Sequence, residues 1–186
     1  METDAELIVR SLEEPVAFAA VFERHYEAIL GYLHRRLVSD LAEDQAAETF
    51  VIAFRRRDQF NSDYPSAKPW LFGIASNLVR ESAREERLRM AAYTRLPVPV
   101  GPAEASEADS RMDAAAMRGE LVSALLALRI EEREVLLLFS WGELSYAEIA
   151  EALRVPEGTV RSRLSRARAH VISQLADSTR ERIQAP

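Results

Sequence analysis

The sequence predicts an all-α fold, built as two small helical domains joined by a flexible linker. Three observations predict it. Apolar residues recur at steps of three and four along most of the chain, which is the spacing of helices that bury one face. A stretch rich in Pro, Gly, Ala, Ser and acidic residues, 96–112, has no periodic apolar face and separates two groups of helical segments. The length of 186 residues is enough for two small domains.

Residues 1–14 are acidic and sparse in large apolar side chains, so we expect a mobile tail. The first long helix is predicted over residues 15–38. Its apolar stripe predicts a buried face and consists of Phe18, Phe22, Tyr26, Ile29, Leu33 and Leu37. His25 and His34 have no neighbouring ligand pattern that suggests a metal site, and we expect both at the surface or at its boundary.

A second helix is predicted over residues 40–57, and its buried face consists of Ala46, Phe50, Ala53 and Phe54. The other side of the helix carries an acidic rim beside an aliphatic residue, formed by Asp44, Gln45, Glu48 and Ile52. This face is suited to docking a basic partner. Two alternatives remain open, since the face could pack on another helix or could simply be solvated. A metal site formed by Glu43, Asp44 and Glu48 is a poor third reading.

A polar connection follows over residues 58–69, where two prolines and the run Asn61, Ser62 and Asp63 break the helix. The loop also carries two aromatic side chains, Phe60 and Tyr64, on which a nucleic-acid base could stack. Alternatively, each aromatic ring anchors the loop on the core.

A third helix is predicted from Trp70 to about Arg95, and its buried face begins with Trp70, Ile74 and Leu78. Beyond Val79 the pattern changes, and arginines share one side of the helix at Arg80, Arg84 and Arg87. This side suits the phosphate backbone of a nucleic acid. The alternative is a solvated helix end held by salt bridges. These elements predict a first domain over residues 15–95.

The second domain is predicted over residues 113–178, followed by a tail at 179–186. Two helices, at 113–128 and 131–141, form a platform for a helix-turn-helix. The first helix of that motif starts with a capping box, since Ser145 is followed by Glu148. A very short turn follows, and Pro156 suits the first position of the next helix, where its missing N–H costs nothing.

The second helix of the motif has two distinct faces. Its buried side is predicted from steps of three and four that join Val160, Leu164, Ala167, Val171 and Leu175. At about 100° per residue, an outer strip points directly away from it and carries Ser162, Ser165 and Ala169.

Arginines lie beside this outer strip. Arg161 and Arg166 flank it, Arg168 lies further round and Arg163 lies closer to the buried side. A serine can donate or accept at a base edge, and an arginine can bridge the O6 and N7 atoms of guanine. The remaining arginines suit phosphates. The pattern therefore predicts a helix that enters the major groove, and the alternative is a solvated basic face on an ordinary packed helix.

The charge is unevenly distributed along the sequence, and the composition excludes several classes of site. The net charge is −6, yet residues 1–50 carry −7 and residues 154–170 carry +4, which suits two partners of opposite charge. The absence of cysteine excludes disulfides, thiolate zinc sites and cysteine nucleophiles. No run of about 18 apolar residues occurs, so we expect a cytoplasmic protein without membrane insertion. We predict no cofactor and no bound metal.

With these elements assigned, the chain resembles bacterial RNA polymerase sigma factors of the extracytoplasmic-function (ECF) group over about residues 16–95 and 114–175. The likeness to region four of that group is carried by EEREVLLLFSWGELSYAEIAEAL and VPEGTVRSRLSRAR. The likeness to region two is carried by AEDQAAETFVIAF and PWLFGIASNLVRE. Other helix-turn-helix families share the GTV-x-S-R signature, but both halves in this order are much more specific.

The resemblance implies a role for each face. Docking of region two on the clamp helices of the largest polymerase subunit would use Asp44, Gln45, Glu48 and Ile52. The melted non-template strand of the downstream promoter element would be held by Phe60, Asn61, Ser62, Asp63, Asn77, Arg80 and Arg84. The upstream element would be read as duplex DNA by Arg161, Ser162, Arg163, Ser165, Arg166 and Arg168. The implied partners are core RNA polymerase, promoter DNA and an anti-sigma protein.

Rival functions remain open at this point. One is a conventional regulator with a helix-turn-helix output domain, and another is a sigma-like protein that titrates polymerase without initiating transcription. An enzyme is the least favoured class, because the chain has no phosphate-binding loop, no dinucleotide fingerprint, no HExxH and no nucleophile elbow. The resemblance implies that the polymerase performs the chemistry.

Overall fold

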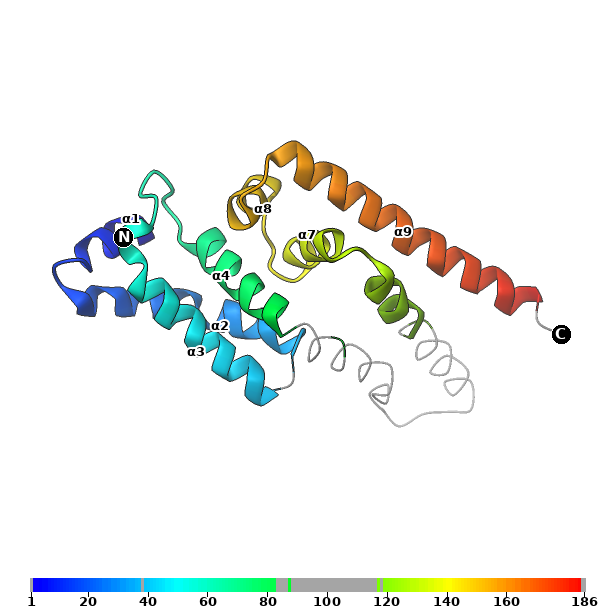
Figure 1. Cartoon of the computed structure of the whole chain (residues 1–186), viewed down its shortest axis with the longest axis horizontal. Coiled ribbons are helices and arrows are strands. Elements are labelled where there is room, and N and C mark those ends of the chain that lie inside the picture. The colour runs from blue at the N-terminus through cyan, green and yellow to red at the C-terminus, as the bar shows by residue number, and fades with distance from the viewer. Residues whose placement is uncertain (1, 38, 83–86, 88–116, 118, 185–186) are drawn as a thin grey trace.

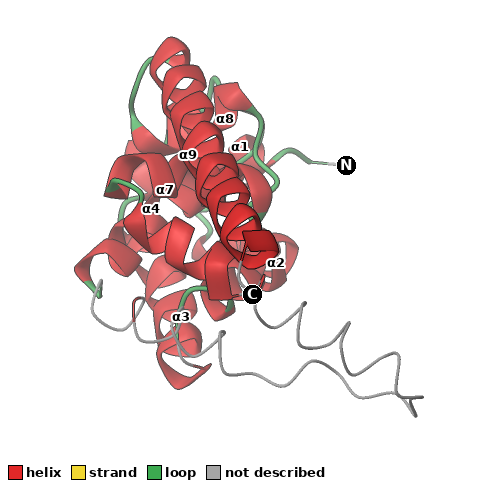
Figure 2. Cartoon of the chain, turned by 90° about the vertical axis from the view of Figure 1, so that its right-hand side faces the viewer, coloured by secondary structure: helices red, strands yellow, loops and turns green. Residues whose placement is uncertain are grey.

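A computed structural model describes residues 2–37, 39–82, 87, 117 and 119–184, and within those ranges the chain forms helices and connecting turns without a strand (Figures 1 and 2). We call the part up to residue 82 the first half and the part from residue 119 the second half. The first half contains α1 (Asp4–Arg10), a short 3-10 helix (Pro15–Phe18), α2 (Ala19–His34), α3 (Ser39–Arg55), a 3-10 turn (Arg57–Gln59) and α4 (Lys68–Glu81). The second half contains a helical segment at 119–127, then α7 (Ile130–Ser140), α8 (Tyr146–Leu153) and α9 (Glu157–Gln184).

Within the expected mobile tail at residues 1–14, Asp4–Arg10 form a packed helix, α1, so the expectation of mobility was wrong there. Thr3 and Glu6 form a capping box, in which the Thr3 hydroxyl accepts the Glu6 N–H and the Glu6 carboxylate accepts the Thr3 N–H. Leu7 and Ile8 are buried in the core of the first half. A cap and two buried aliphatic side chains therefore hold a segment whose overall acidity suggested disorder.

The predicted helix 15–38 forms continuously over residues 15–34 and ends earlier than predicted. A 3-10 turn at its start precedes α2, and α2 ends at His34. Most of the predicted stripe is core, with Ile29 and Leu33 fully buried, but Phe22 is 38% exposed. The Phe22 ring instead packs at the rim on Tyr26 and Phe50, with centroid distances of 4.7 and 4.9 Å. The stripe was therefore predicted correctly except at its most exposed ring.

Helix α4 lies between the two halves, which explains why its burial exceeds the prediction (Figure 1). It packs on α2 and α3 on one side and on α8 on the other. Ile74 is buried as predicted, whereas Trp70 and Leu78 are only partly buried. Because α4 is packed on two sides, further apolar and small residues are buried, namely Leu71, Phe72, Gly73, Ala75, Ser76 and Val79.

Close approach of α4 and α8 depends on Gly73. A Cβ atom added there would lie 2.5 Å from the backbone carbonyl oxygen of Ala152 on α8. No side chain fits at that distance without moving one helix. The sequence therefore allows the two halves to meet backbone to backbone at this one position.

Helix α9 is longer than predicted and continues to Gln184, so residues 179–184 of the expected tail are helical. The predicted linker 96–112 and most of the predicted helix end at 83–95 lie outside the described residues. In the part of the chain that the structure describes, no helix is long and apolar enough to cross a membrane.

Candidate nucleic-acid interface

The helix-turn-helix forms as its sequence signals predict. The Ser145 N–H donates to the Glu148 carboxylate at 2.8 Å, and the Glu148 N–H donates to the Ser145 hydroxyl at 3.3 Å. Helix α8 ends at Leu153, and the next residue, Arg154, has a φ of 54° in the left-handed region. The Val155 N–H then donates to the Ala150 carbonyl at 3.0 Å, which closes the helix end. Pro156 lies one residue before α9 rather than inside it.

The two predicted faces of α9 are confirmed by burial. The predicted inner side faces the core, with Val160, Leu164 and Ala167 at 1% exposure or less. The outer strip is exposed at Ser162, Ser165 and Ala169. Periodicity alone therefore identified the surface that α9 offers to a partner.

Several arginines of α9 have partners within the chain. Arg161 forms an exposed ion pair with Glu157 at 2.8 Å. Arg166 donates to the Glu132 carboxylate on α7 at 2.7 Å, and its side chain stays 59% exposed. The Arg168 guanidinium lies 4.8 Å from the centre of the Phe139 ring. Arg163 is partly buried, as its position closer to the core side predicts.

Four of the predicted downstream-element residues line a cavity of about 790 Å³, which we call the α4–α8 cavity, whereas Ser62 and Asp63 are not part of its wall. Its wall in the first half includes Phe60, Asn61, Trp70, Asn77 and Arg80. Its wall in the second half includes Ala150, Glu151, Arg154 and Glu157. Residues of the loop and of the third predicted helix therefore meet at one site, and the helix-turn-helix faces them.

Within this cavity, the aromatic ring of Phe60 is packed against another side chain. The Phe60 ring packs on Trp70 with a centroid distance of 5.1 Å, which is the anchoring alternative from the sequence. Asn61, Ser62 and Asp63 are exposed, and the Asn61 side-chain oxygen accepts the Asp63 N–H at 3.0 Å. Phe60 therefore anchors the loop on Trp70, while Asn61, Ser62 and Asp63 are exposed to solvent.

Some of the wall was missed by the sequence analysis. Arg56 follows α3, Gln59 ends the 3-10 turn, and both line the same cavity. Their only signal was position, since Gln59 lies within the predicted connection 58–69 and Arg56 lies just before it. Arg80 is exposed as expected, whereas Arg84 lies outside the described residues.

The second-half wall of the cavity carries an unusual carboxyl group. Burial, together with the nearby Glu148 charge, raises the pKa of Glu151 to about 7. Glu151 therefore exchanges its proton near neutral pH. Near neutral pH its average negative charge is smaller than that of a fully ionised glutamate, and it therefore neutralises less of the positive charge of the cavity arginines.

The acidic face of α3 agrees with the prediction at two positions and differs at two. Asp44 and Glu48 are exposed, and Ile52 is partly buried against the core. Gln45 is only 8% exposed, and its amide donates to the Ser82 hydroxyl at the end of α4 at 2.6 Å. The expectation of an exposed Gln45 was wrong because this residue lies at the edge of the buried arc, one helical turn before buried Thr49.

The two halves are joined by a buried polar cluster, which we call the α2–α7 network. It consists of Tyr32, Arg36, Ser76 and Glu134. Arg36 donates to both Glu134 carboxylate oxygens, at 2.6 and 3.3 Å, and the Tyr32 hydroxyl donates to the same carboxylate at 3.0 Å. Burial acts to raise the pKa of Glu134, but the Arg36 charge and the hydrogen bonds from Arg36, Ser76 and Tyr32 together outweigh it and lower that pKa.

Within the described ranges, no group of three or more His, Asp or Glu side chains could hold a metal ion. The surfaces that the structure brings together are instead an arginine-flanked helix, an acidic helix face and an aromatic cavity. None of these arrangements assembles a nucleophile with a base.

Comparisons with known proteins assign both halves. Residues 21–89 match the family described as Sigma-70 region 2, and residues 118–171 match the family described as Sigma-70, region 4. The chain is 31% identical to RNA polymerase sigma factor CarQ of Myxococcus xanthus over 153 residues, which cover 81% of this chain and 84% of CarQ. It is also 31% identical, with the same coverage, to ECF RNA polymerase sigma factor SigL of Mycobacterium tuberculosis.

The fold agrees with these matches. The structure of CnrH in complex with the cytosolic domain of CnrY is similar, with a TM-score of 0.66 and 25% identity over 94% of this chain and 97% of that chain. A second solved structure, sigma factor RpoE with the anti-sigma factor NepR from Bartonella quintana, has a TM-score of 0.51 at 23% identity and shares the fold. This chain belongs to the ECF family of RNA polymerase sigma factors.

Proposed function

We propose that this sigma factor reads the upstream promoter element with α9 and holds the melted downstream element at the loop 60–63 and α4. The observation that carries the first part is the exposed strip of Ser162 and Ser165, flanked by Arg161 and Arg166 on the face of α9 that points away from the core. Hydroxyl and guanidinium groups on an exposed helix face suit base edges in the major groove. Arg163 and Arg168 suit the neighbouring phosphates.

For the downstream element, the support is the α4–α8 cavity. Its first-half wall combines aromatic rings at Phe60 and Trp70 with Asn61, Asn77 and Arg80. A base taken out of a stack needs a ring to lie on and polar groups to bond its edge. These side chains supply both, and Ser62 and Asp63 extend the exposed loop. The role proposed for Arg84 rests on the sequence alone, because Arg84 lies outside the described residues.

Docking on core polymerase uses the acidic face of α3 in this proposal. Asp44 and Glu48 are exposed one turn apart, and Ile52 follows on the same side. They suit a basic helical surface such as the polymerase clamp. Gln45 is buried and does not form part of the exposed face; its hydrogen bond to Ser82 joins α3 to the end of α4.

The docking face is tested by reversing its charge. Asp44→Arg with Glu48→Arg should reduce the affinity for sigma-free core polymerase by at least about tenfold, since like charges across an interface cost several kcal/mol. Glu23→Arg with Glu27→Arg on α2 is the matched control, because these exposed acids have the same spacing and undergo the same charge change. Equal loss in both variants would mean that net charge, rather than this face, controls binding.

Upstream readout is tested at Arg166. Arg166→Ala should cost about 1–3 kcal/mol of binding at the upstream element if the side chain contacts a base edge. The affinity of polymerase carrying the variant is measured on the matched promoter and on promoters substituted in that element. A loss that is equal on every sequence would make Arg166 a phosphate contact instead.

We further propose that the chain acts in the cytoplasm beside the polymerase, catalyses no reaction itself and is held by an anti-sigma protein. The support is the similar fold of CnrH and RpoE, each solved with a second protein that their descriptions name as CnrY and as the anti-sigma factor NepR. Within the family, the chemistry belongs to the polymerase. A pull-down from cells that express the tagged chain should recover both core polymerase and a separate inhibitory protein.

The decisive experiment mixes the purified chain with core polymerase and runs transcription on a genomic fragment library. Stable association with new, discrete start sites is the expected result, and the start sites yield both promoter elements. Association without initiation would indicate a protein that titrates polymerase. Sequence-specific DNA binding without association would indicate a conventional helix-turn-helix regulator.

A further inference from the structure

The loop that carries the proposed downstream-element residues is tied at both ends to the N-terminal segment of the chain. The loop leaves the 3-10 turn Arg57–Gln59 and ends at Ala67, directly before α4. The two ties involve Asp4 on α1 and Ser11 at its end. Neither residue belongs to the cavity wall, and no role in promoter recognition follows from the docking and reading surfaces described above.

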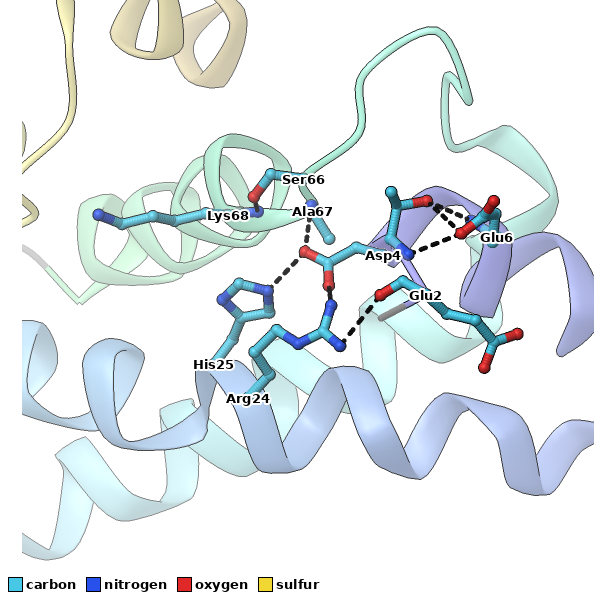
Figure 3. A network of polar contacts seen from close by, with 9 residues as sticks. Glu2, Asp4, Glu6, Arg24, His25, Ser66, Ala67 and Lys68 are labelled. Carbon is cyan, nitrogen blue, oxygen red and sulfur yellow. Dashed lines mark hydrogen bonds and ion pairs between the residues drawn. The ribbon is translucent and has the colours of Figure 1, made fainter.

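At the end of the loop, Asp4 makes a convergent set of contacts (Figure 3). One of its carboxylate oxygens accepts the Ala67 N–H at 2.8 Å and meets the His25 Nε2 atom at 2.6 Å. The other oxygen accepts from Arg24. The Asp4 backbone N–H donates to the Pro65 carbonyl at 3.0 Å. Asp4 is only 2% exposed, so these contacts are made away from bulk water.

Asp4 adds a carboxylate to the start of α4. The residue before α4 is Ala67, whose side chain cannot cap the helix, and the Ser66 hydroxyl accepts only the Lys68 N–H, at 3.2 Å. A carboxylate at a helix N-terminus stabilises it by accepting a free N–H and by opposing the positive end of the helix dipole. Asp4 provides that carboxylate from a different helix, so α1 helps to fix where α4 begins.

At the start of the loop, Arg57 forms the second tie. Its Nε atom donates to the Ser11 carbonyl at 3.3 Å, and its Nη1 atom donates to the Phe54 carbonyl at 2.6 Å. The same guanidinium lies 4.0 Å from the centre of the Phe54 ring. The entry of the loop is thus joined to the segment that follows α1, while its exit is joined to α1 itself.

We propose that Asp4 is a positioning residue for downstream-element recognition, which fixes the loop 60–63 against the first turns of α4 through its contacts with Ala67 and Pro65. This inference rests on the proposed role of the loop as a reader of the melted strand. Trp70 lies three residues after Ala67 and packs on Phe60, so a shift of the helix start moves both aromatic walls of the cavity together. Asp4 acts through these groups and does not touch the nucleic acid.

The test compares Asp4→Ala with the wild-type chain in holoenzyme reconstituted with core polymerase. The readout is the ratio of transcription from a promoter to transcription from the same promoter with one base substituted in the downstream element. We expect Asp4→Ala to reduce this ratio about tenfold, as expected when one base-reading contact is lost. Core polymerase affinity and the corresponding upstream-element ratio should stay within about twofold of the wild type, which is well below a tenfold effect.

Three further variants separate positioning from stability. Arg10→Ala, on the same helix in an exposed ion pair with Glu2, should change nothing. Ile29→Val, in the core on α2, should lower the unfolding midpoint without changing the ratio. Asp4→Asn keeps the side-chain shape and one acceptor oxygen, so it should show a smaller loss in the same direction if Asp4→Ala fails to fold. An equal loss of the ratio in Ile29→Val would overturn the inference.

A spectroscopic readout reports the cavity directly. In a Trp141→Phe background, Trp70 is the single tryptophan of the chain. Asp4→Ala should increase the quenching of Trp70 by acrylamide, because its contact with Phe60 loosens, whereas Arg10→Ala should not. Unchanged quenching together with an unchanged ratio would overturn the positioning role.

Exchange of the loop Phe60 to Asp63 for that of another family member separates this inference from the proposed function. If the exchange alters downstream preference and Asp4→Ala does not, the reading loop stands and the positioning role fails. If neither variant alters the preference, both proposals fail. If Asp4→Ala alters it and the exchange does not, the loop is not the reader, and the positioning of that loop by Asp4 fails together with its proposed role, because base readout then belongs to α4.

Discussion

Two buried carboxylates, Asp4 and Glu134, use similar chemistry in different regions of the molecule. Asp4 is held by arginine, histidine and a backbone N–H inside the first half, whereas Glu134 is held by Arg36 and Tyr32 across the junction of the halves. Asp4 therefore fixes a loop within one half, and Glu134 fixes one half against the other. The comparison teaches that a buried ion pair takes its function from the elements that it joins.

The largest effect is expected at the junction. Glu134→Ala removes a buried carboxylate that accepts from Arg36 and Tyr32, and should lower the free energy of unfolding by about 3–5 kcal/mol. Urea denaturation measures this change. Arg36→Met with Glu134→Leu is the control and should recover most of the loss, because a well-packed apolar pair replaces the buried charges.

A loss below about 1 kcal/mol in Glu134→Ala would be typical of a solvated pair. That outcome would mean that the halves separate in solution and that Arg36 reaches water. The comparison with Asp4 would then be sharper, since only the carboxylate inside one half would be held firmly.

An intermediate loss of stability is expected when Asp4 is neutralised, and the size of this loss depends on pH. Burial acts to raise the pKa of Asp4, but hydrogen bonds from His25, Ala67 and Arg24 outweigh it and lower the pKa from 3.8 to about 2. The folded state therefore binds this proton less readily than the unfolded state. The shift corresponds to about 2 kcal/mol of stability that is present above pH 3.8 and is lost as the pH falls through about 2.

Asp4→Asn removes this titration. The difference in unfolding free energy between the wild type and Asp4→Asn should be largest near about pH 6 and should shrink towards about pH 3. Denaturant titrations over that range measure it. A difference that stays constant with pH would mean that Asp4 contributes through its shape and not through its charge.

The smallest loss of stability is expected at Gly73, where the halves meet through backbone atoms and not through polar side chains. Gly73→Ala forces α4 and α8 apart, at a cost of about 1–3 kcal/mol, but alanine favours the helix by about 1 kcal/mol. The net loss of stability should therefore be about 1 kcal/mol, with a larger radius of gyration in small-angle scattering. Gly31→Ala on α2 is the control, because an added Cβ there meets nothing within 4 Å and should only stabilise the helix.

Local signals in the sequence predicted local structure well. The steps that join Val160, Leu164 and Ala167 identified both faces of α9, because helical periodicity depends only on near neighbours. The capping box of Ser145 and Glu148 located the start of α8 for the same reason. The exposure of the predicted DNA-reading strip followed from these two signals, whereas its contacts with DNA remain a proposal.

Contacts between distant segments could not be predicted in this way. Asp4 and His25 are 21 positions apart, and Tyr32 and Glu134 are 102 positions apart, so no spacing rule relates them. His25 was expected near the surface because a helical wheel does not reveal that another helix covers it. One signal for α1 was nevertheless present in Thr3 and Glu6, the same capping pattern that correctly located α8.

The ion pair between Arg166 and Glu132 has a consequence for the salt dependence of promoter binding. DNA affinity falls with salt because each cationic side chain that neutralises a phosphate releases condensed counterions. A phosphate or base that takes Arg166 must first displace Glu132, so this arginine exchanges one anionic partner for another. The salt dependence of upstream-element binding should therefore be shallower than the number of arginines on α9 suggests.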